Sequence, residues 1–313
     1  MKLKKLIEEA KQISLFAHAR PDGDALGSQF GLAGYLRSRY PDKPVFICGS
    51  DGLRYGDFFP LKTPVSSEDI RASLAIVLDT PSVKRVEDQR FLSASKIVRI
   101  DHHPGGEDFA ILDIEDVTAS STSELVAGIL YKWDSTPLDK EIAAYFYFGL
   151  LFDTLCLSIP SVSEKTMAIA AWLAKSGMSV SDVNQAYTQV PLSLFEAVSA
   201  LRSKLVYDQR GLGYVVLTND FYQSYGVDIQ AIKEQVHVLG EIRELKFWAL
   251  FLQDENNPQE YSGSLRARKT PIRALAQKYG GGGHELACGI SHLTLKRLNE
   301  LIEELALLAA QSE

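Results

Sequence analysis

The chain has 313 residues, of which 46% are hydrophobic and 23% charged, so it is long enough for two globular domains of ordinary composition. Its formal net charge of −7 argues against a protein that coats long nucleic acid through bulk electrostatics. Three scattered cysteines without a CxxC pair indicate reduced thiols in a cytoplasmic protein, and no apolar run predicts an export signal or a membrane span.

The first half of the chain alternates between strand-like and helix-like patterns. Helical spacing of apolar residues predicts one helix at the start and a second that ends before Pro41. Four short apolar runs are predicted strands: 13–17, 45–48, 74–78 and 96–100. This alternation is typical of an α/β domain with a mostly parallel sheet and right-handed crossovers.

Three of these strands run directly into side chains that bind metals. The first is followed by His18, Asp22 and Asp24, the third by Asp79, and the fourth by Asp101, His102 and His103. In open α/β sheets, ligands bind outside the carboxyl ends of the strands, so we expect these side chains to converge. Adjacent residues of an extended chain point to opposite sides, so one histidine of the pair can bind a metal while the other faces substrate.

The helices that follow contain a further carboxylate. Ser121-Thr-Ser-Glu124 matches a capping box, which we interpret as structural. Thr136-Pro is expected to open a long, largely apolar helix that ends at Asp153, and a carboxylate in such a setting needs a positive partner, which a metal would provide. Further helices are predicted at 164–176 and from about 187–191. We expect a catalytic domain over 1–187, a linker helix region over 188–207 and a second domain over 208–313.

The second domain is predicted to be a smaller mixed α/β unit. Strands are expected near 214–218, 245–253, 259–268 and 286–290, with a helix from Pro271 to Gly280 and a last helix from about Leu293. Five basic residues and no acidic one lie between Ser262 and His284, which predicts a local anion-binding island: Arg266, Arg268, Lys269, Arg273 and Lys278. The glycines that precede His284, namely Gly281, Gly282 and Gly283 after Gly280, are expected to form a loop whose backbone N–H groups approach a phosphate.

The candidate ligands of the first domain suit two metal ions. Two imidazoles and four carboxylates are too many charges for one divalent ion but fit two ions that share a carboxylate: His18, Asp22, Asp24, Asp79, His102 and Asp153. This mixture favours Mn²⁺, then Mg²⁺, over Zn²⁺. Two such ions can clamp the oxygens of a phosphoryl group, so the residues indicate phosphoester hydrolysis.

In combination, these motifs resemble the DHH phosphoesterases. The matching segments are His-Ala-Arg-Pro-Asp-Gly-Asp-Ala-Leu-Gly-Ser, Leu-Asp-Thr, Asp-His-His-Pro and Leu-Phe-Asp-Thr, with Ser264-Leu-Arg266 and Gly-Gly-Gly-Gly-His resembling the DHH-associated domain of stand-alone nanoRNase and pAp phosphatases. The resemblance implies that His18 and Asp22 bind one metal, that Asp24, His102 and Asp153 bind the other, and that Asp79 bridges. It also implies an orienting role for Asp101, a leaving-group role for His103, and substrate binding by Arg266, His284 and the glycine loop.

By the same resemblance, the substrates would be short oligoribonucleotides or 3′-phosphoadenosine 5′-phosphate, with no long duplex and no membrane as partners. Two alternatives stay open: a phosphodiesterase of linear or cyclic dinucleotides such as pApA and c-di-AMP, and a nucleotide-binding protein without catalysis, although every ligand position is filled. A homodimer is compatible with the sequence. Leu155-Cys-Leu-Ser158 departs from the family pattern, in which a glycine is usual after the Asp-Thr pair.

Overall fold

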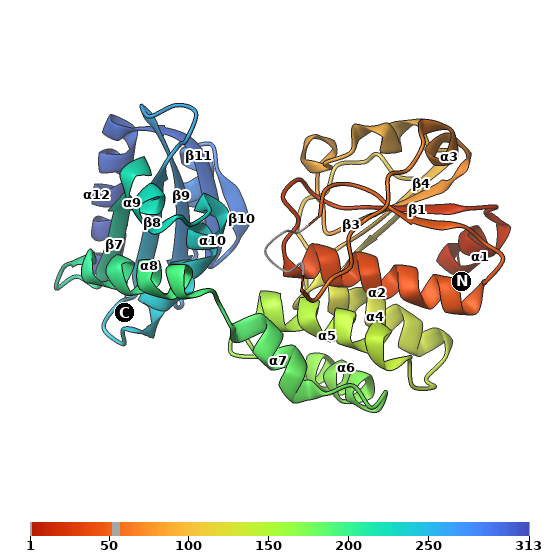
Figure 1. The fold of residues 1–313 in the computed structure, drawn as a ribbon. Helices are drawn as coiled ribbons and strands as arrows, with labels where there is room; N and C mark the ends of the chain where they lie inside the picture. Colours follow the sequence, from red (N-terminus) through yellow and green to blue (C-terminus); the bar gives the residue numbers. More distant parts are fainter. Residues whose placement is uncertain (1, 52–56, 313) are drawn as a thin grey trace. The chain divides into compact units, whose positions relative to one another are not determined.

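The computed structural model describes residues 2–51 and 57–312, and the chain separates into two compact units, Met1–Gln189 and Val190–Glu313 (Figure 1). Each unit has its own sheet and its own hydrophobic core. The segment 188–207, predicted as a linker helix region, contains helix α8 (Leu192–Ser203), and its side chains Leu194, Ala197 and Leu201 belong to a core of the second unit.

The first unit is built on a five-stranded sheet in which every strand pairs in parallel. The strands are β1 (Ile13–Phe16), β2 (Val45–Ile47), β3 (Leu74–Leu78), β4 (Lys96–Asp101) and β5 (Leu112–Glu115), in the order β2-β1-β3-β4-β5. The first four were predicted, and the α/β fold class is confirmed. Strand β5 was not predicted, because Leu-Asp-Ile-Glu alternates apolar and acidic residues over a short edge strand.

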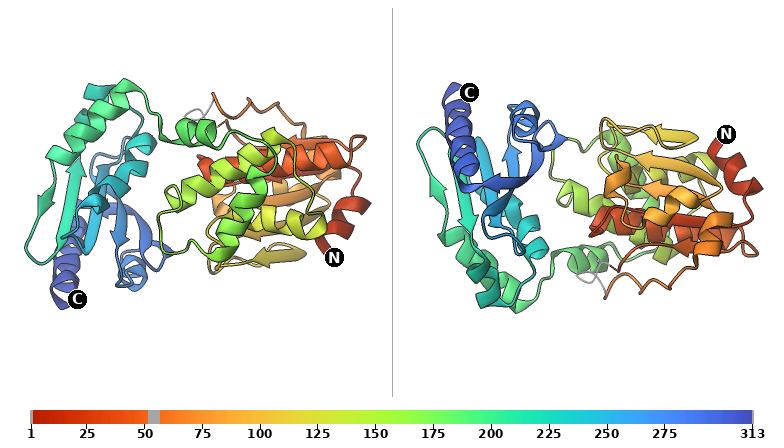
Figure 2. Two further views of the ribbon diagram at one scale, coloured as in Figure 1. Left: turned by 90° about the horizontal axis from the view of Figure 1, so that it is seen from below. Right: turned by 90° about the horizontal axis from the view of Figure 1, so that it is seen from above.

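Helices cover both faces of this sheet, because its central strands are buried on both sides. Alternate residues of β3 show the division: Leu74, Ile76 and Leu78 pack into one cluster, whereas Ala75 and Val77 pack into the other. Three helices of the first cluster lie side by side beneath the sheet: α2 (Gly23–Arg39), α4 (Thr122–Trp133) and α5 (Lys140–Thr154) (Figure 1). Figure 2 shows this unit from below and from above. Among the described residues, the unit has these further helices: α1 (Lys2–Glu9), α3 (Ser67–Ala72), η2 (Val83–Arg85), η3 (Gln89–Ser93), α6 (Glu164–Ala174) and α7 (Val180–Thr188).

Two helix boundaries differ from the prediction. Helix α5 begins at Lys140 and not at Thr136-Pro137, because the Asp139 side chain accepts a hydrogen bond from the Glu141 N–H and caps the helix there. The helix predicted from about 187–191 begins at Leu192, and α7 precedes it without having been predicted. Its cap is Ser179, whose side chain accepts from the Asp182 N–H.

The second unit is a mixed six-stranded sheet in the order β10-β11-β9-β8-β7-β6. Its strands are β6 (Val206–Tyr207), β7 (Leu212–Leu217), β8 (Phe247–Gln253), β9 (Glu260–Ala267), β10 (Gly282–His284) and β11 (Ala287–Thr294). Its helices after α8 are α9 (Asn219–Tyr225), α10 (Ile229–Lys233), η4 (Glu234–Glu241), α11 (Arg273–Lys278) and α12 (Leu295–Gln311). Along β8, Phe247, Ala249 and Phe251 pack against α11 and α12, whereas Leu250 and Leu252 pack against α8 to α10 and η4.

The glycine run is not the open loop that the sequence predicted. Gly282, Gly283 and His284 form the edge strand β10, which pairs with β11. A side chain at Gly281 or Gly283 would come within 2.4 Å of a carbonyl oxygen of β11, so these glycines allow the two backbones to approach. Across the ranges that the structure describes, no helix combines the length and apolar character needed to cross a membrane.

Candidate metal centre

The candidate ligands of the first unit meet at one edge of its sheet. The chain reverses its direction of strand addition between β1 and β3, and ligands bind outside the carboxyl ends of the strands at such a switch point. His18 follows β1, Asp79 follows β3 and His102 follows β4. The structure therefore brings these three segments together, as expected.

Asp79 lies at the centre of the group. Its side chain is 2% exposed, with Oδ2 3.5 Å from His18 Nε2 and Oδ1 3.6 Å from His102 Nε2. Its backbone is left-handed, with φ 54°, so the chain turns sharply as it leaves β3. The Thr122 hydroxyl donates to Asp79 Oδ1 at 3.0 Å. One carboxylate thus faces imidazoles that come from two different strands.

His18 and Asp22 form one side of the centre. His18 Nε2 lies 3.5 Å from Asp22 Oδ2, while His18 Nδ1 is 3.0 Å from the Ala19 carbonyl oxygen. The other oxygen of Asp22 caps helix α2, because it accepts hydrogen bonds from the N–H groups of Asp24 and Ala25. Asp22 therefore fixes the start of the helix with Oδ1 and leaves Oδ2 facing His18.

Asp24 is fully buried and is held by the first turn of α4. Its two carboxylate oxygens accept hydrogen bonds from the N–H groups of Thr122 and Ser123, at 2.7 and 2.8 Å. In the first turn of a helix, no carbonyl of the helix itself is placed to accept hydrogen bonds from these N–H groups. Half of the predicted capping box is present, since Ser121 Oγ accepts from the Glu124 N–H. The Glu124 side chain accepts from the Ser120 N–H and hydroxyl and not from the Ser121 N–H. The purely structural interpretation of this segment was too narrow, because the same turn orients a candidate ligand.

His102 and Asp153 form the other side. His102 is 3% exposed, its Nε2 lies 3.1 Å from Asp153 Oδ2, and its Nδ1 is 3.4 Å from the Ala119 carbonyl oxygen. Asp153 stands in the last turn of α5, where the helix dipole disfavours a negative charge. A cation near Asp153 would offset both the burial and the dipole.

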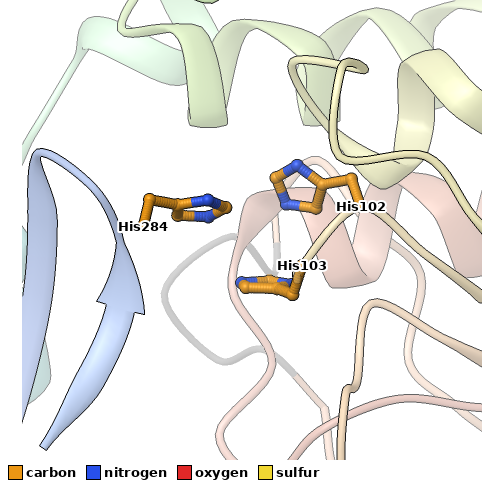
Figure 3. Close-up of side chains that lie close together, drawn as sticks. All are labelled: His102, His103 and His284. Atoms are coloured by element: carbon orange, nitrogen blue, oxygen red, sulfur yellow. The ribbon is translucent and has the colours of Figure 1, made fainter. Parts of the chain in front are cut away.

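His103 is arranged differently from its neighbour. Its backbone N–H and its Nδ1 both approach Asp101 Oδ1, at 3.0 and 2.9 Å, and because a carboxylate only accepts, Nδ1 is the donor. The side chain of His103 is 21% exposed, against 4% for His102. The two rings lie edge to face with centroids 4.5 Å apart, and both leave the segment after β4 (Figure 3). Asp101 therefore orients one of the two histidines.

The electrostatics of the centre reflect the crowding of carboxylates and imidazoles. Burial alone would lower the pKa of His102, but the hydrogen bond and charge of Asp153 raise it to about 9. Burial would raise the pKa of Asp79, yet hydrogen bonds from the neighbouring imidazoles hold it well below its usual range. The pKa of Asp24 is raised, first by burial and then by the charges of Asp79 and Asp153. Protons on the histidines thus balance part of the negative charge that cations would otherwise balance.

The geometry of these residues fits divalent metal ions. Two groups of side chains offer ligand atoms within 4.8 Å of one another, and they share Asp79: His18, Asp22 and Asp79, then Asp24, Asp79 and His102. In both His18 and His102, Nδ1 lies near a backbone carbonyl oxygen and Nε2 faces the carboxylates. Metal-binding histidines usually have this arrangement. A third group, Asp79, Asp101 and His103, is better explained by the hydrogen bond that joins the last two residues.

Sequence reasoning missed two residues of this centre. Arg99 is fully buried, and its guanidinium donates to Asp101 Oδ2 at 2.9 Å. The available signal was a charged residue inside the apolar run 96–100. Thr122, which donates to Asp79, had no signal beyond its place in a helix cap.

In the second unit, Arg266 and His284 lie in one row across three strands. Both residues pair with Ala287 of the intervening strand β11, Arg266 from β9 and His284 from β10. Directly paired residues of antiparallel strands project from the same face of the sheet, so the two side chains share a face, about 10 Å apart across the small Ala287. His284 is drawn in Figure 3 beside its strand.

The predicted anion-binding island is smaller in the structure. Arg268 donates to three backbone carbonyls, those of Gly240, Ile242 and Leu245. Lys278 pairs with Glu304, and Arg273 lies 3.6 Å from Glu285. These three basic residues therefore support the fold of the unit.

Both units match known protein families. Residues 12–150 match the DHH family, N-terminal domain, and residues 212–311 match the DHHA1 domain. The chain is 30% identical over 304 residues to the bifunctional oligoribonuclease and PAP phosphatase NrnA of Bacillus subtilis, and the alignment covers 96% of each protein. The chain belongs to the DHH family of phosphoesterases.

A second relative and a solved structure are also similar to this chain. A probable bifunctional oligoribonuclease and PAP phosphatase NrnA of Streptococcus mutans is 28% identical, with 94% of this chain and 93% of that protein covered. The crystal structure of an exopolyphosphatase-related protein from Bacteroides fragilis matches with a TM-score of 0.85 and 24% identity, over 98% of this chain and 96% of that one. This second likeness supports the fold.

Proposed function

We propose that this DHH-family phosphoesterase hydrolyses short oligoribonucleotides to nucleoside monophosphates and 3′-phosphoadenosine 5′-phosphate to AMP. The observation that carries the proposal is a pair of ligand groups sharing Asp79, in a chain that aligns over nearly its full length with enzymes named bifunctional oligoribonuclease and PAP phosphatase. The protein acts in the cytoplasm in this proposal, in line with the free thiols of Cys48, Cys156 and Cys288. Long duplex nucleic acid is not among its substrates.

Six side chains hold the metals in this proposal. His18 and Asp22 bind one ion, Asp79 bridges, and the second ion takes the remaining ligands: Asp24, His102 and Asp153. Mn²⁺ is the first choice and Mg²⁺ the second for such oxygen and imidazole donors. When bound, the two ions clamp the phosphoryl oxygens and supply an activated water.

His103 then serves the leaving group. Its Nδ1 is engaged by Asp101, so Nε2 is the nitrogen that can hand a proton to the departing oxygen. The greater exposure of His103 than of His102 supports this division, because a group that meets substrate must be reachable. Asp101 keeps the ring in the tautomer that carries its proton on Nδ1 in the neutral form.

Arg266 and His284 bind a phosphate or the terminal nucleotide of the substrate. Their shared face on the second sheet supports this role. Of Gly281, Gly282 and Gly283, Gly282 is the best suited to contribute, since a side chain there would meet no atom of the described residues within 4 Å. Gly281 and Gly283 contribute by keeping β10 close to β11.

A panel of substrates tests the function. The purified protein with Mn²⁺ is incubated separately with di- to pentaribonucleotides, the 3′,5′-bisphosphate, pApA, c-di-AMP, pyrophosphate and a twenty-nucleotide strand. We expect the highest kcat/KM on the shortest ribonucleotides and on the bisphosphate. The dinucleotide arms are included because the cyclic-di-AMP phosphodiesterase PdeA of Listeria monocytogenes is 25% identical, although this chain covers 45% of that protein. Cleavage of the twenty-nucleotide strand at an equal rate would refute the proposal.

The same panel tests the substrate-binding residues. Arg266→Ala should raise KM with little change in kcat, because it removes a contact remote from the reacting phosphate. Lys269→Ala is the matched control, since it removes the same charge from an exposed position three residues away. Equal effects of the two variants would mean that Arg266 acts through bulk charge and makes no specific contact.

A further inference from the structure

Arg99 is a cation placed inside the first sheet. It occupies the middle of β4 with 0% exposure, between apolar neighbours. Burial of an isolated guanidinium is strongly unfavourable, so such a residue is retained only with partners that match its charge and its donors. Arg99 is not a candidate metal ligand, and its role has to be sought in what it holds.

Three carboxylates surround the guanidinium. Nε and one terminal nitrogen donate to the two oxygens of Asp113 at 2.9 Å, in the bidentate geometry that fixes a guanidinium plane. The same terminal nitrogen reaches Glu115 at 2.6 Å, and the other donates to Asp101 Oδ2 at 2.9 Å. The side chains of Asp113 and Glu115 are 41% and 32% exposed, whereas that of Asp101 is 0% exposed. Strand β5 thus anchors the arginine, and the arginine balances the charge of Asp101, which is the fully buried member of the three.

The contact continues from Asp101 to His103. The carboxylate uses Oδ2 for Arg99 and Oδ1 for both the backbone N–H and the Nδ1 of His103. The hydrogen bond from Arg99 to Oδ2 fixes the plane of the Asp101 carboxylate. The direction in which Oδ1 can accept a hydrogen bond from His103 is therefore fixed as well. The ring of His103 is therefore set by a chain of contacts that begins at β5.

The loop after His103 closes over the same guanidinium. A side-chain carbon at Gly106 would lie 2.0 Å from Arg99 Cζ, so the backbone there rests against the guanidinium. The Gly106 N–H donates to Glu115 Oε2 at 3.2 Å, the oxygen that also accepts from Arg99. The guanidinium therefore contacts the chain on both sides of His103, at Asp101 before it and at Gly106 after it.

We infer that Arg99 is the positioning residue for His103: through Asp101 and the loop at Gly106, it holds the imidazole in the orientation that serves the leaving group. The inference rests on the leaving-group role proposed for His103. It predicts that loss of Arg99 lowers catalysis without removing the metals, because none of its partners is a proposed metal ligand.

The experiment compares two leaving groups in Arg99→Met and His103→Ala. A dinucleotide releases a ribose hydroxyl that needs a proton, whereas a nucleoside 5′-phosphate p-nitrophenyl ester releases a phenolate that does not. For Arg99→Met we expect kcat on the dinucleotide to fall about 10²-fold, within the range for loss of an oriented general acid, while KM, bound metal and turnover of the ester stay within about threefold. Adding His103→Ala to Arg99→Met should cause no further loss beyond that of His103→Ala alone.

A readout independent of turnover is the tautomer of the neutral His103 ring, observed by long-range ¹H–¹⁵N correlation at a pH high enough to remove the second proton from the imidazole. The wild type should carry a proton on Nδ1, and Arg99→Met should lose that preference. Should Arg99→Met fail to fold, Gly106→Ala tests the contact between Arg99 and Asp101, because the added methyl group would displace the guanidinium while its charge is kept. We expect the same result as for Arg99→Met: a lower kcat on the dinucleotide, with bound metal and turnover of the ester retained.

Equal losses of Arg99→Met on both substrates, loss of its metals, or full additivity with His103→Ala would each overturn the inference. If His103→Ala itself does not discriminate between the leaving groups, the proposed role of His103 fails, and the tautomer then decides whether Arg99 positions the ring. An unchanged tautomer in the variant would overturn the positioning role in that case as well.

Discussion

Gly149 lies where α5 meets the turn that holds Asp24, and adding one methyl group there tests the packing behind the metal centre. An alanine Cβ at this position would lie 2.1 Å from Ser123 Oγ and 3.0 Å from Asp24 Oδ1. Ser123 contacts Asp24 twice, since its N–H donates to Oδ1 and its hydroxyl to the Asp24 carbonyl oxygen. The methyl group would therefore push on a candidate ligand and on the group that orients it.

The magnitude follows from two opposing effects. Gly→Ala in an open helix stabilises by about 1 kcal/mol, through backbone entropy. Overpacking of a rigid core typically costs about 1–3 kcal/mol. At Gly149, the contact of 2.1 Å must open by more than an ångström to reach an ordinary separation, which favours the upper part of that range. We expect a net loss of about 1–2 kcal/mol in the free energy of unfolding of Gly149→Ala, with weaker binding of the metal that Asp24 holds.

Gly128→Ala is the matched control, because Gly128 lies within α4 and its added carbon would meet only Ile169 Cδ1, at 3.8 Å. That variant should gain about 0.5–1 kcal/mol from helix propensity. Urea denaturation of the metal-free proteins gives the free energies, and calorimetric titration with Mn²⁺ gives the affinities. The reasoning is refuted if Gly149→Ala is as stable as Gly128→Ala and binds Mn²⁺ like the wild type.

Two further predictions concern stability. Leu155, Cys156 and Leu157 have φ values of 46°, 58° and 64°, a left-handed turn without glycine, and Cys156 is exposed. Cys156→Gly should therefore raise the free energy of unfolding by roughly 0.5–1 kcal/mol and Cys156→Val should lower it, as thermal melting can show; the reverse order would contradict the left-handed turn. In metal-stripped protein, the pKa of His102 is raised from 6.5 to about 9, so its stabilising contribution is present below pH 6.5 and is lost as the pH rises through 9. Urea denaturation between these pH values should show stability falling with pH, whereas a flat profile would mean that the carboxylates do not hold the histidine proton.

The sequence predicted the strands that end in ligands, because buried parallel strands are apolar throughout and their carboxyl ends are marked by polar residues. It did not predict β5, because Asp113 and Glu115 interrupt any apolar run and their contacts with Arg99 are visible only in the fold. A buried charge network of this kind links residues that are far apart in the chain and carries no local spacing. Arg99 itself is visible in the sequence as a charge in an apolar run, but its three partners are not.

The role of backbone groups was also beyond the sequence. Nothing in Ser121-Thr-Ser-Glu124 indicates that the N–H groups of this turn hold Asp24, which lies almost a hundred residues earlier. In the second unit, counting basic residues overestimated the anion-binding island, because Arg268 and Lys278 bind backbone carbonyls and Glu304 instead. The pairing that aligns Arg266 with His284 depends on strand register, which the glycine run concealed.

The most direct test of the metal centre is Asp79→Asn. The substitution removes one charge and changes almost no volume, and asparagine tolerates the left-handed backbone at this position, so the fold should persist. Asp139→Asn, at an exposed helix cap where both residues serve equally, is the control. Bound Mn²⁺ per chain and turnover of a diribonucleotide are measured on both variants. A bridging Asp79 predicts that Asp79→Asn loses turnover and binds fewer than two ions while the control matches the wild type; two bound ions with turnover near the wild type would contradict the shared-ligand centre.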